Sequence, residues 1–228
     1  MTRRSNGAAS RGSRLGALWS PKRVLALAPH TDDVEIGAGG FVSRLVRAGA
    51  EVHYVAFSIA RESVPAGFPP DILAKEVKRA TARLGIPRKR LRILDYPVRR
   101  FPEHRQPILE ELIRLRKEIN PDLVLVHAGS DVHQDHRTVH EEAVRAFRHT
   151  TLLGYELPWN NLEFRTQSVV ALTETEMRRK IHALAAYRSQ RHRRYASEEV
   201  IRGLAQMRGL LIGARYAEAF EVVRWALP

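Results

Sequence analysis

The residues best equipped for chemistry begin at His30, which is followed by Asp32 and Asp33 in the stretch VLALAPHTDDVEIGAGG. An imidazole and two carboxylates within four positions can bind a divalent metal ion or move a proton. The alternative is a solvated polar turn in which Asp32 or Asp33 caps the helix that follows. This stretch by itself leaves both interpretations open.

A second group of the same kind lies far along the chain, in the segment HAGSDVHQDH. Its metal-ligating or proton-transferring side chains are His127, Asp131, His133, Asp135 and His136. A single histidine is more often structural than ligating. Three histidines and two aspartates within ten residues are difficult to explain as surface decoration, and they indicate a site.

Both groups directly follow short apolar runs. The runs Val24–Ala28 and Leu123–Val126 show no polar alternation, which is typical of strands covered on both faces in a parallel sheet. Ligand sites of such sheets lie beyond the carboxyl ends of the strands. Because these ends meet at one edge, the two polar groups are predicted to converge there.

The rest of the chain reads as alternating strands and helices. Strands are predicted over Glu51–Ile59, Leu91–Leu94 and, at a sheet edge, Ala219–Trp225; helices are predicted over Phe41–Ala48, Asp71–Leu84, Pro107–Ile119, Arg137–Phe147, Ser197–Ala214 and around Met177–Arg194. We therefore expect an α/β protein, a Rossmann-like three-layer sandwich with a mainly parallel sheet. A single domain is predicted over residues 21–228, after a basic tail at residues 1–20 that is predicted to be disordered.

Composition limits the partners and the metal chemistry. The formal charge is +13, from 38 Lys and Arg against 25 Asp and Glu, which invites a nucleic-acid interpretation. Much of the excess, however, is arginine interspersed with glutamate on amphipathic helices, which is typical of a solvated face. We favour an anionic small-molecule substrate and expect no nucleic-acid partner. A homo-oligomer is left open.

The chain contains no cysteine. A disulfide framework and a thiolate metal site are both excluded, so His, Asp or Glu must hold any zinc ion. The first twenty residues have no apolar run long enough for a signal peptide or a membrane span. We expect a cytoplasmic protein.

Two motifs resemble those of the LmbE and PIG-L superfamily of zinc-dependent de-N-acetylases. APHTDDVEIGAGG is similar to the HPDDE-type opening of that family, and VHQDH is similar to its HxDH signature. ARYAEAFEV resembles the closing segment, so the likeness runs from Val24 to Val223. Two departures are Thr31, where proline is usual, and Val34, which shifts the acidic Glu35 by one position. Neither removes a proposed ligand.

The resemblance implies that His30, Asp33 and His136 bind the metal ion, zinc or alternatively Fe2+. Two histidines and one carboxylate leave a coordination position open for water, as hydrolytic zinc sites do. Zinc can lower the pKa of that water to about 7.

The resemblance also implies that Asp32 is the general base and that His133 lies beside the scissile carbonyl, with Asp135 as its hydrogen-bonded partner. Asp32 could take a proton as water attacks the amide carbon. Protonated His133 could then stabilise the oxyanion or assist the leaving amine. Asp135 would hold the tautomer of His133 and raise its pKa.

Candidate substrate contacts lie in two further regions. In the run YELPWNNL, Glu156, Trp159 and Asn160 offer the aromatic face and polar groups that suit a sugar ring, although a packing role is an equal alternative. Arg61 and Arg99 follow predicted strands and could clamp a phosphate or a carboxylate.

These features predict a hydrolase that removes an N-acetyl group from an N-acetylglucosamine-type amino sugar or its conjugate and releases acetate. One alternative is hydrolysis of a different acyl amide at the same site. Another is a nucleotide- or nucleic-acid-binding module that uses Gly37, Gly39 and Gly40. GAGG lacks the GxGxxG spacing, and the preceding carboxylates would repel a pyrophosphate, so the module is the weaker reading.

Overall fold

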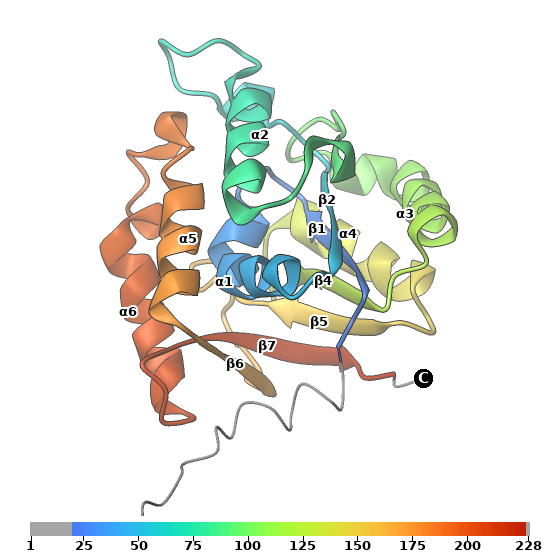
Figure 1. Cartoon of the computed structure of the whole chain (residues 1–228). Helices are drawn as coiled ribbons and strands as arrows, with labels where there is room; N and C mark the ends of the chain where they lie inside the picture. Colours follow the sequence, from blue (N-terminus) through green and yellow to red (C-terminus); the bar gives the residue numbers. More distant parts are fainter. Residues whose placement is uncertain (1–19, 227–228) are drawn as a thin grey trace, which may run out of the picture.

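A seven-stranded sheet with the strand order β3-β2-β1-β4-β5-β7-β6 runs through the centre of the protein (Figure 1). This computed structural model describes residues 20–226, so the tail predicted at residues 1–20 falls outside the described residues except for Ser20. The strands are β1 (Arg23–Ala28), β2 (Glu51–Ala56), β3 (Leu91–Ile93), β4 (Leu123–His127), β5 (Thr151–Tyr155), β6 (Ser168–Leu172) and β7 (Tyr216–Arg224).

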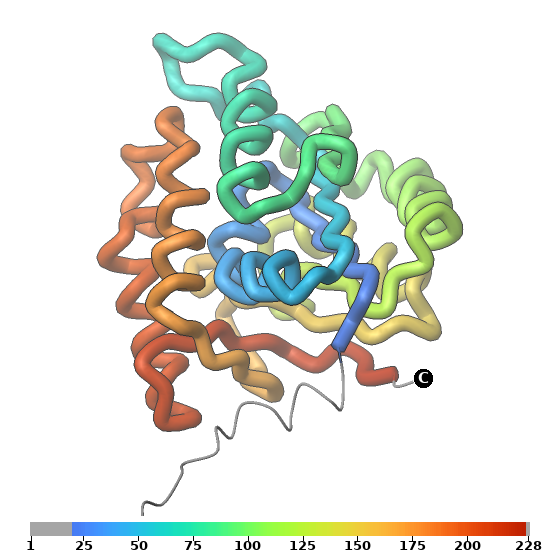
Figure 2. The backbone as a smooth tube through the Cα atoms, in the orientation of Figure 1, coloured from blue at the N-terminus to red at the C-terminus, as the bar shows by residue number. Residues whose placement is uncertain are grey.

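Six α-helices in the described part of the chain cover this sheet. They are α1 (Asp33–Arg47), α2 (Ile72–Leu84), α3 (Arg105–Ile119), α4 (Gln134–Ala146), α5 (Glu174–Leu184) and α6 (Glu198–Leu210). Helices α3 and α4 pack on one face of the sheet, and α1, α2, α5 and α6 pack on the other. The backbone in Figure 2 follows the same three layers. The chain thus forms a single α/β domain, as predicted.

Strands β1 to β5 are parallel, whereas β7 runs antiparallel to both of its neighbours, β5 and β6. The mainly parallel sheet is therefore confirmed. The prediction that the last strand lies at a sheet edge is wrong, because β6 takes the edge and β7 lies between β5 and β6. β5 and β6 were not predicted.

The glycines of α1 serve helix packing. A side chain at Gly37 would overlap the ring of Tyr155, and one at Gly40 would press on Leu172. Both glycines lie inside the helix, after the polar turn, where they let the helix approach the sheet. The glycine-based nucleotide-binding alternative finds no support in this arrangement.

The strand order reverses between β1 and β4, which are adjacent in the sheet although β2 and β3 separate them in sequence. Open α/β sheets form their ligand crevice at such a switch point, beyond the carboxyl ends of the strands. Both polar groups identified in the sequence follow these two strands. Among the described residues, no helix is both long enough and apolar enough to cross a membrane.

Candidate metal centre

The turn between β1 and α1 holds the first polar group in a fixed shape. The backbone N–H of His30 donates to Asp33 Oδ2 at 2.7 Å, which closes the turn on itself. Asp32 occupies the N-cap position of α1, but its side chain makes no capping hydrogen bond. The Asp32 carboxylate is therefore free for another role, and helix capping does not explain it.

Three donor atoms from the two polar groups converge on one point. Nδ1 of His30 lies 3.0 Å from Nε2 of His136, and Oδ2 of Asp33 lies 3.5 Å and 3.4 Å from these two nitrogens. Ligands about 2.0 to 2.1 Å from a tetrahedral zinc ion are about 3.3 Å apart. The triangle formed by His30 Nδ1, His136 Nε2 and Asp33 Oδ2 fits one cation and leaves a fourth coordination position free. The predicted convergence of the two groups is confirmed.

His133 offers an alternative third ligand, since nitrogen atoms of His30, His133 and His136 lie within 4.8 Å of one another. Two nitrogens on opposite sides of a zinc ion would be at most about 4.2 Å apart at the usual bond length. The set containing Asp33 is tighter and adds a negative charge, so it fits a divalent cation better.

Carboxylates hold the outer nitrogens of both converging histidines. Nε2 of His30 lies 3.0 Å from Asp135 Oδ2, and Nδ1 of His136 lies 2.6 Å from Asp131 Oδ2. With a cation at the central point, each imidazole would donate its outer ring N–H to its carboxylate and direct the lone pair of its other nitrogen toward the cation. Such partners fix the tautomer and the ring orientation of metal-binding histidines. The sequence placed Asp131 in the cluster without assigning it this role.

The charges around the site attract a cation. Although burial acts to lower it, the carboxylates of Asp33 and Asp131 raise the pKa of His136 to about 10. Burial and the neighbouring charge of Asp33 raise the pKa of Asp32 to about 6, while the positive charge of Arg193 acts in the opposite direction. A carboxylate with a pKa in this range is suited to accept a proton near neutral pH.

The side-chain partner predicted for His133 is corrected by the structure. His133 is the N-cap of α4, and its Nδ1 accepts a hydrogen bond from the backbone N–H of Asp135 at 3.1 Å. The Asp135 carboxylate points elsewhere, to His30 and to the backbone N–H groups of Arg99 and Phe101. Burial, together with the charges of His30 and His136, lowers the pKa of His133 to about 4. The imidazole is thus neutral, with its proton on Nε2.

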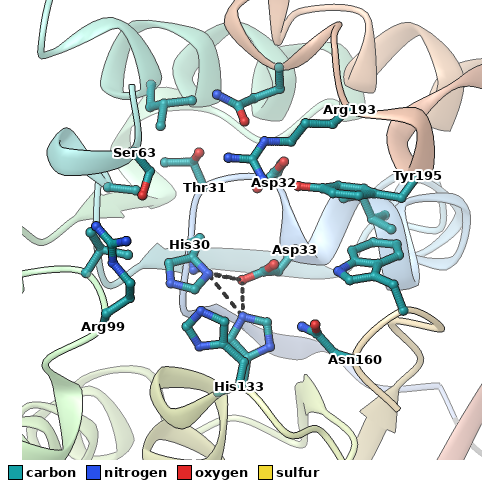
Figure 3. A pocket seen from close by; sticks show the side chains of 17 residues that line it. His30, Thr31, Asp32, Asp33, Ser63, Arg99, His133, Asn160, Arg193 and Tyr195 are labelled. Carbon is teal, nitrogen blue, oxygen red and sulfur yellow. Dashed lines mark hydrogen bonds and ion pairs between the residues drawn. The ribbon is translucent and has the colours of Figure 1, made fainter. Parts of the chain in front are cut away.

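A cavity of about 280 Å³ opens beside the triangle (Figure 3). It is lined by the predicted site residues His30, Asp32, Asp33, His133, His136, Arg99, Trp159 and Asn160. Arg61 and Glu156, which we predicted as substrate contacts, do not line it. Arg61 pairs with Asp95 on the surface, and buried Glu156 pairs with Arg208 of α6, with 2.9 Å between Oε2 and Nε.

The segment joining α5 to α6 supplies lining residues that the sequence did not single out as ligands, among them Arg193 and Tyr195. The Tyr195 ring stacks on Trp159, with ring centroids 4.0 Å apart and planes 19° apart. This segment has no regular hydrophobic period from which its place at the pocket could be predicted.

Comparison with known proteins identifies the family. The family model PIG-L, described as GlcNAc-PI de-N-acetylase, matches residues 25–147. The chain belongs to the PIG-L family. It is 26% identical over 172 residues to the uncharacterized deacetylase YaiS of Escherichia coli strain K12, a match covering 74% of this chain and 91% of YaiS. The predicted LmbE and PIG-L resemblance is thereby confirmed.

Two archaeal deacetylases extend the comparison. The chain is 32% identical over 126 residues to diacetylchitobiose deacetylase of Thermococcus kodakarensis, a match covering 51% of this chain and only 45% of that protein. The structure of N,N'-diacetylchitobiose deacetylase from Pyrococcus horikoshii superposes with a TM-score of 0.76 at 24% identity. That superposition covers 89% of this chain and 84% of the other, and it supports the shared fold.

The family match includes only part of the site. All of the converging donors and their carboxylate partners lie within the PIG-L match at residues 25–147, whereas Trp159, Arg193 and Tyr195 lie beyond it. The candidate metal centre therefore lies within the region that matches the family, whereas part of the pocket wall comes from residues after 147.

Proposed function

We propose that this PIG-L family protein is a zinc-dependent hydrolase that removes the acetyl group from an N-acetylglucosamine-type amino sugar or its conjugate. The observation that carries the proposal is the triangle of His30, Asp33 and His136 with the Asp32 carboxylate beside it in one pocket. Family membership and the deacetylase relatives support the reaction class. The sugar named in two of those relatives supports the substrate type.

His30, Asp33 and His136 would hold the cation, with Fe2+ as the alternative to Zn2+. When bound, such a cation polarises the amide carbonyl and acidifies water at neutral pH. As ligands of the cation, these residues would contribute one negative charge and two neutral imidazoles, whose outer nitrogens are engaged by Asp135 and Asp131. This donor set contains no thiolate, consistent with the absence of cysteine.

Asp32 acts as the general base in this proposal. Its carboxylate lines the pocket, makes no capping hydrogen bond and has its pKa raised to about 6 by burial and by Asp33. It accepts a proton from the water that attacks the amide carbon. The amide C–N bond then breaks, the proton is passed to the leaving nitrogen, and acetate and the free amine result.

His133 assists as a neutral hydrogen-bond donor. Its Nδ1 is occupied as an acceptor by the Asp135 backbone N–H, which leaves Nε2–H as the donor on this pocket-lining ring. A neutral imidazole donor stabilises the negative charge that develops on the carbonyl oxygen. This role differs from the imidazolium predicted from the sequence, because the surrounding histidines and burial disfavour a positive charge there.

The test is an acetate-release screen with zinc-loaded protein over free, phosphorylated, lipid-linked and nucleotide-linked N-acetylglucosamine. We expect release from at least one substrate, loss after treatment with a chelator and recovery with zinc. The His136→Ala variant is the matched control that zinc should not restore. Acetate release that is indifferent to the chelator would refute the metal-dependent mechanism, and a silent screen would refute the substrate type.

A further inference from the structure

Arg193 stands out among the residues that line the pocket. Its side chain extends from the α5–α6 segment toward Asp32 and lies near Tyr195 (Figure 3). Its guanidinium lies 5.7 Å from the centre of the Tyr195 ring. The segment is anchored beneath the pocket, because the Ser189 side chain and backbone both donate to the buried Glu76 carboxylate of α2. These contacts tie the segment to α2 four residues before Arg193.

Arg193 shares a side-chain hydrogen bond with Tyr195 but has no acidic partner among the described residues, so most of its donors remain available. No carboxylate oxygen within residues 20–226 lies within 4.0 Å of its guanidinium nitrogens, and its Nε is buried without a hydrogen-bond partner. By contrast, Arg208 of the neighbouring helix α6 is engaged by Glu156. Buried donors are almost always satisfied in folded proteins, so an unsatisfied donor on a side chain that lines a cavity is consistent with a ligand group that completes it.

The opposite wall of the pocket also carries positive charge. Arg99 lines the cavity, and its only ion pair among the described residues is a 3.6 Å contact to exposed Glu62. Its backbone has a positive φ of 68°, which places its N–H 2.6 Å from the Asp135 carboxylate. The guanidinium groups of Arg193 and Arg99, neither of which has a close carboxylate partner in the described part of the chain, therefore flank the cavity. The acidic side chains of the site lie around the triangle of His30, Asp33 and His136.

We propose that Arg193 is a specificity-determining residue that binds an anionic group, phosphate or carboxylate, carried by the amino-sugar substrate. This inference rests on the function proposed above and narrows its substrate class. The Nε and Nη donors of the guanidinium can bind two oxygens of a phosphate or a carboxylate at once. A neutral hydroxyl of the substrate cannot accept both of these hydrogen bonds in the same way. The stacked rings of Trp159 and Tyr195 adjoin Arg193 and provide an apolar surface for the sugar ring.

Three variants and three substrates test the assignment. Arg193→Gln removes the charge, Arg193→Lys keeps the charge without the fork, and Arg194→Gln removes an equal charge from an exposed neighbour that does not line the cavity. The substrates are methyl N-acetylglucosaminide, N-acetylglucosamine 1-phosphate and a carboxymethyl N-acetylglucosaminide. Calorimetry with glucosamine 1-phosphate and methyl glucosaminide, which cannot be deacetylated, measures binding independently of turnover.

We expect Arg193→Gln to lower kcat/KM for an anionic substrate by about 10- to 100-fold, mainly through KM, with the neutral glycoside changed less than about twofold. The dissociation constant of glucosamine 1-phosphate should rise by a similar factor. Arg193→Lys should restore part of the loss, and Arg194→Gln should have little effect. Whether the phosphate or the carboxylate substrate shows the larger loss identifies the anion.

Two results would overturn the assignment. An equal loss of kcat on neutral and anionic substrates would mean that Arg193 acts through Asp32, and an equal effect of Arg194→Gln would mean that only the overall charge matters. If no substrate releases acetate, the proposed reaction fails, but the calorimetry still decides whether Arg193 binds the anion.

Discussion

Nδ1 of His136 lies 2.6 Å from Asp131 Oδ2, and this contact turns the other nitrogen of the ring toward His30 and Asp33. Asp131 also accepts the backbone N–H of His133 at 2.9 Å, so one buried carboxylate contacts two of the three histidines of the second polar group. The arrangement of the centre thus depends on a residue that would not itself touch the cation.

Asp131→Asn should weaken metal binding without preventing folding. The amide keeps the size of the side chain but loses the charge that orients His136, and such outer partners typically contribute about 10- to 100-fold to metal affinity. Zinc titration against a competing chelator measures the change. Asp95→Asn, which removes an exposed carboxylate away from the pocket, is the control. Unchanged zinc affinity in Asp131→Asn would contradict the orienting role.

Asp32→Asn and His136→Ala should separate catalysis from metal binding. Asp32→Asn removes the proton acceptor and should lower kcat by about 100- to 10,000-fold while zinc remains bound. His136→Ala removes one corner of the triangle and should lose the metal itself. Metal analysis of the purified variants alongside acetate release checks both. Equal metal loss in the two would mean that ligand and base have been exchanged.

Glu156→Ala should affect stability more than substrate affinity. Glu156 is buried and pairs with Arg208, so its removal leaves a largely buried cation without its partner, at a cost of about 3 kcal/mol. Denaturant unfolding measures this free energy, and KM of the folded fraction should stay unchanged. Glu198→Ala, which breaks an exposed pair with Arg202, should cost less than about 1 kcal/mol. A raised KM in Glu156→Ala would instead support the substrate contact predicted from sequence.

Gly37→Ala should destabilise the protein, whereas Gly203→Ala should not. A methyl group at Gly37 meets the Tyr155 ring, which cannot easily move because its hydroxyl donates to the Leu27 carbonyl at 2.8 Å. Such overpacking costs about 1 to 3 kcal/mol. Gly203 in α6 has open space around it, and alanine there should add up to about 1 kcal/mol of stability. Thermal and denaturant unfolding compare the two, and similar values would refute the packing role of Gly37.

The convergence of the two polar groups was predictable because it follows from topology. Parallel strands bring their carboxyl ends to one edge, so the residues after Ala28 and Val126 had to meet if both strands were parallel and adjacent. Long amphipathic helices such as α2 and α3 were also recognised close to their true bounds, because their hydrophobic period extends over several turns.

Other features depend on contacts that sequence patterns do not encode. β6 is short and only partly buried, and it can be recognised as a strand only from its pairing with β7. The family resemblance implied that the side chains of His133 and Asp135 pair. Because α4 begins at Gln134, however, the His133 side chain contacts the Asp135 backbone and the Asp135 carboxylate turns to His30. Arg193 and Tyr195 lie in an irregular segment without a readable period.

The insertion of β7 between β5 and β6 sets an order of events during synthesis. Within the described chain, β6 pairs only with β7, which follows it by more than forty residues. While the ribosome is still elongating the chain, β1 and β4 can already pair and bring the imidazoles together. One edge of β5 stays unpaired until residues 216–224 have been synthesised. A nascent chain arrested before that point would carry the histidine cluster together with an unprotected strand edge, a species that is prone to self-association.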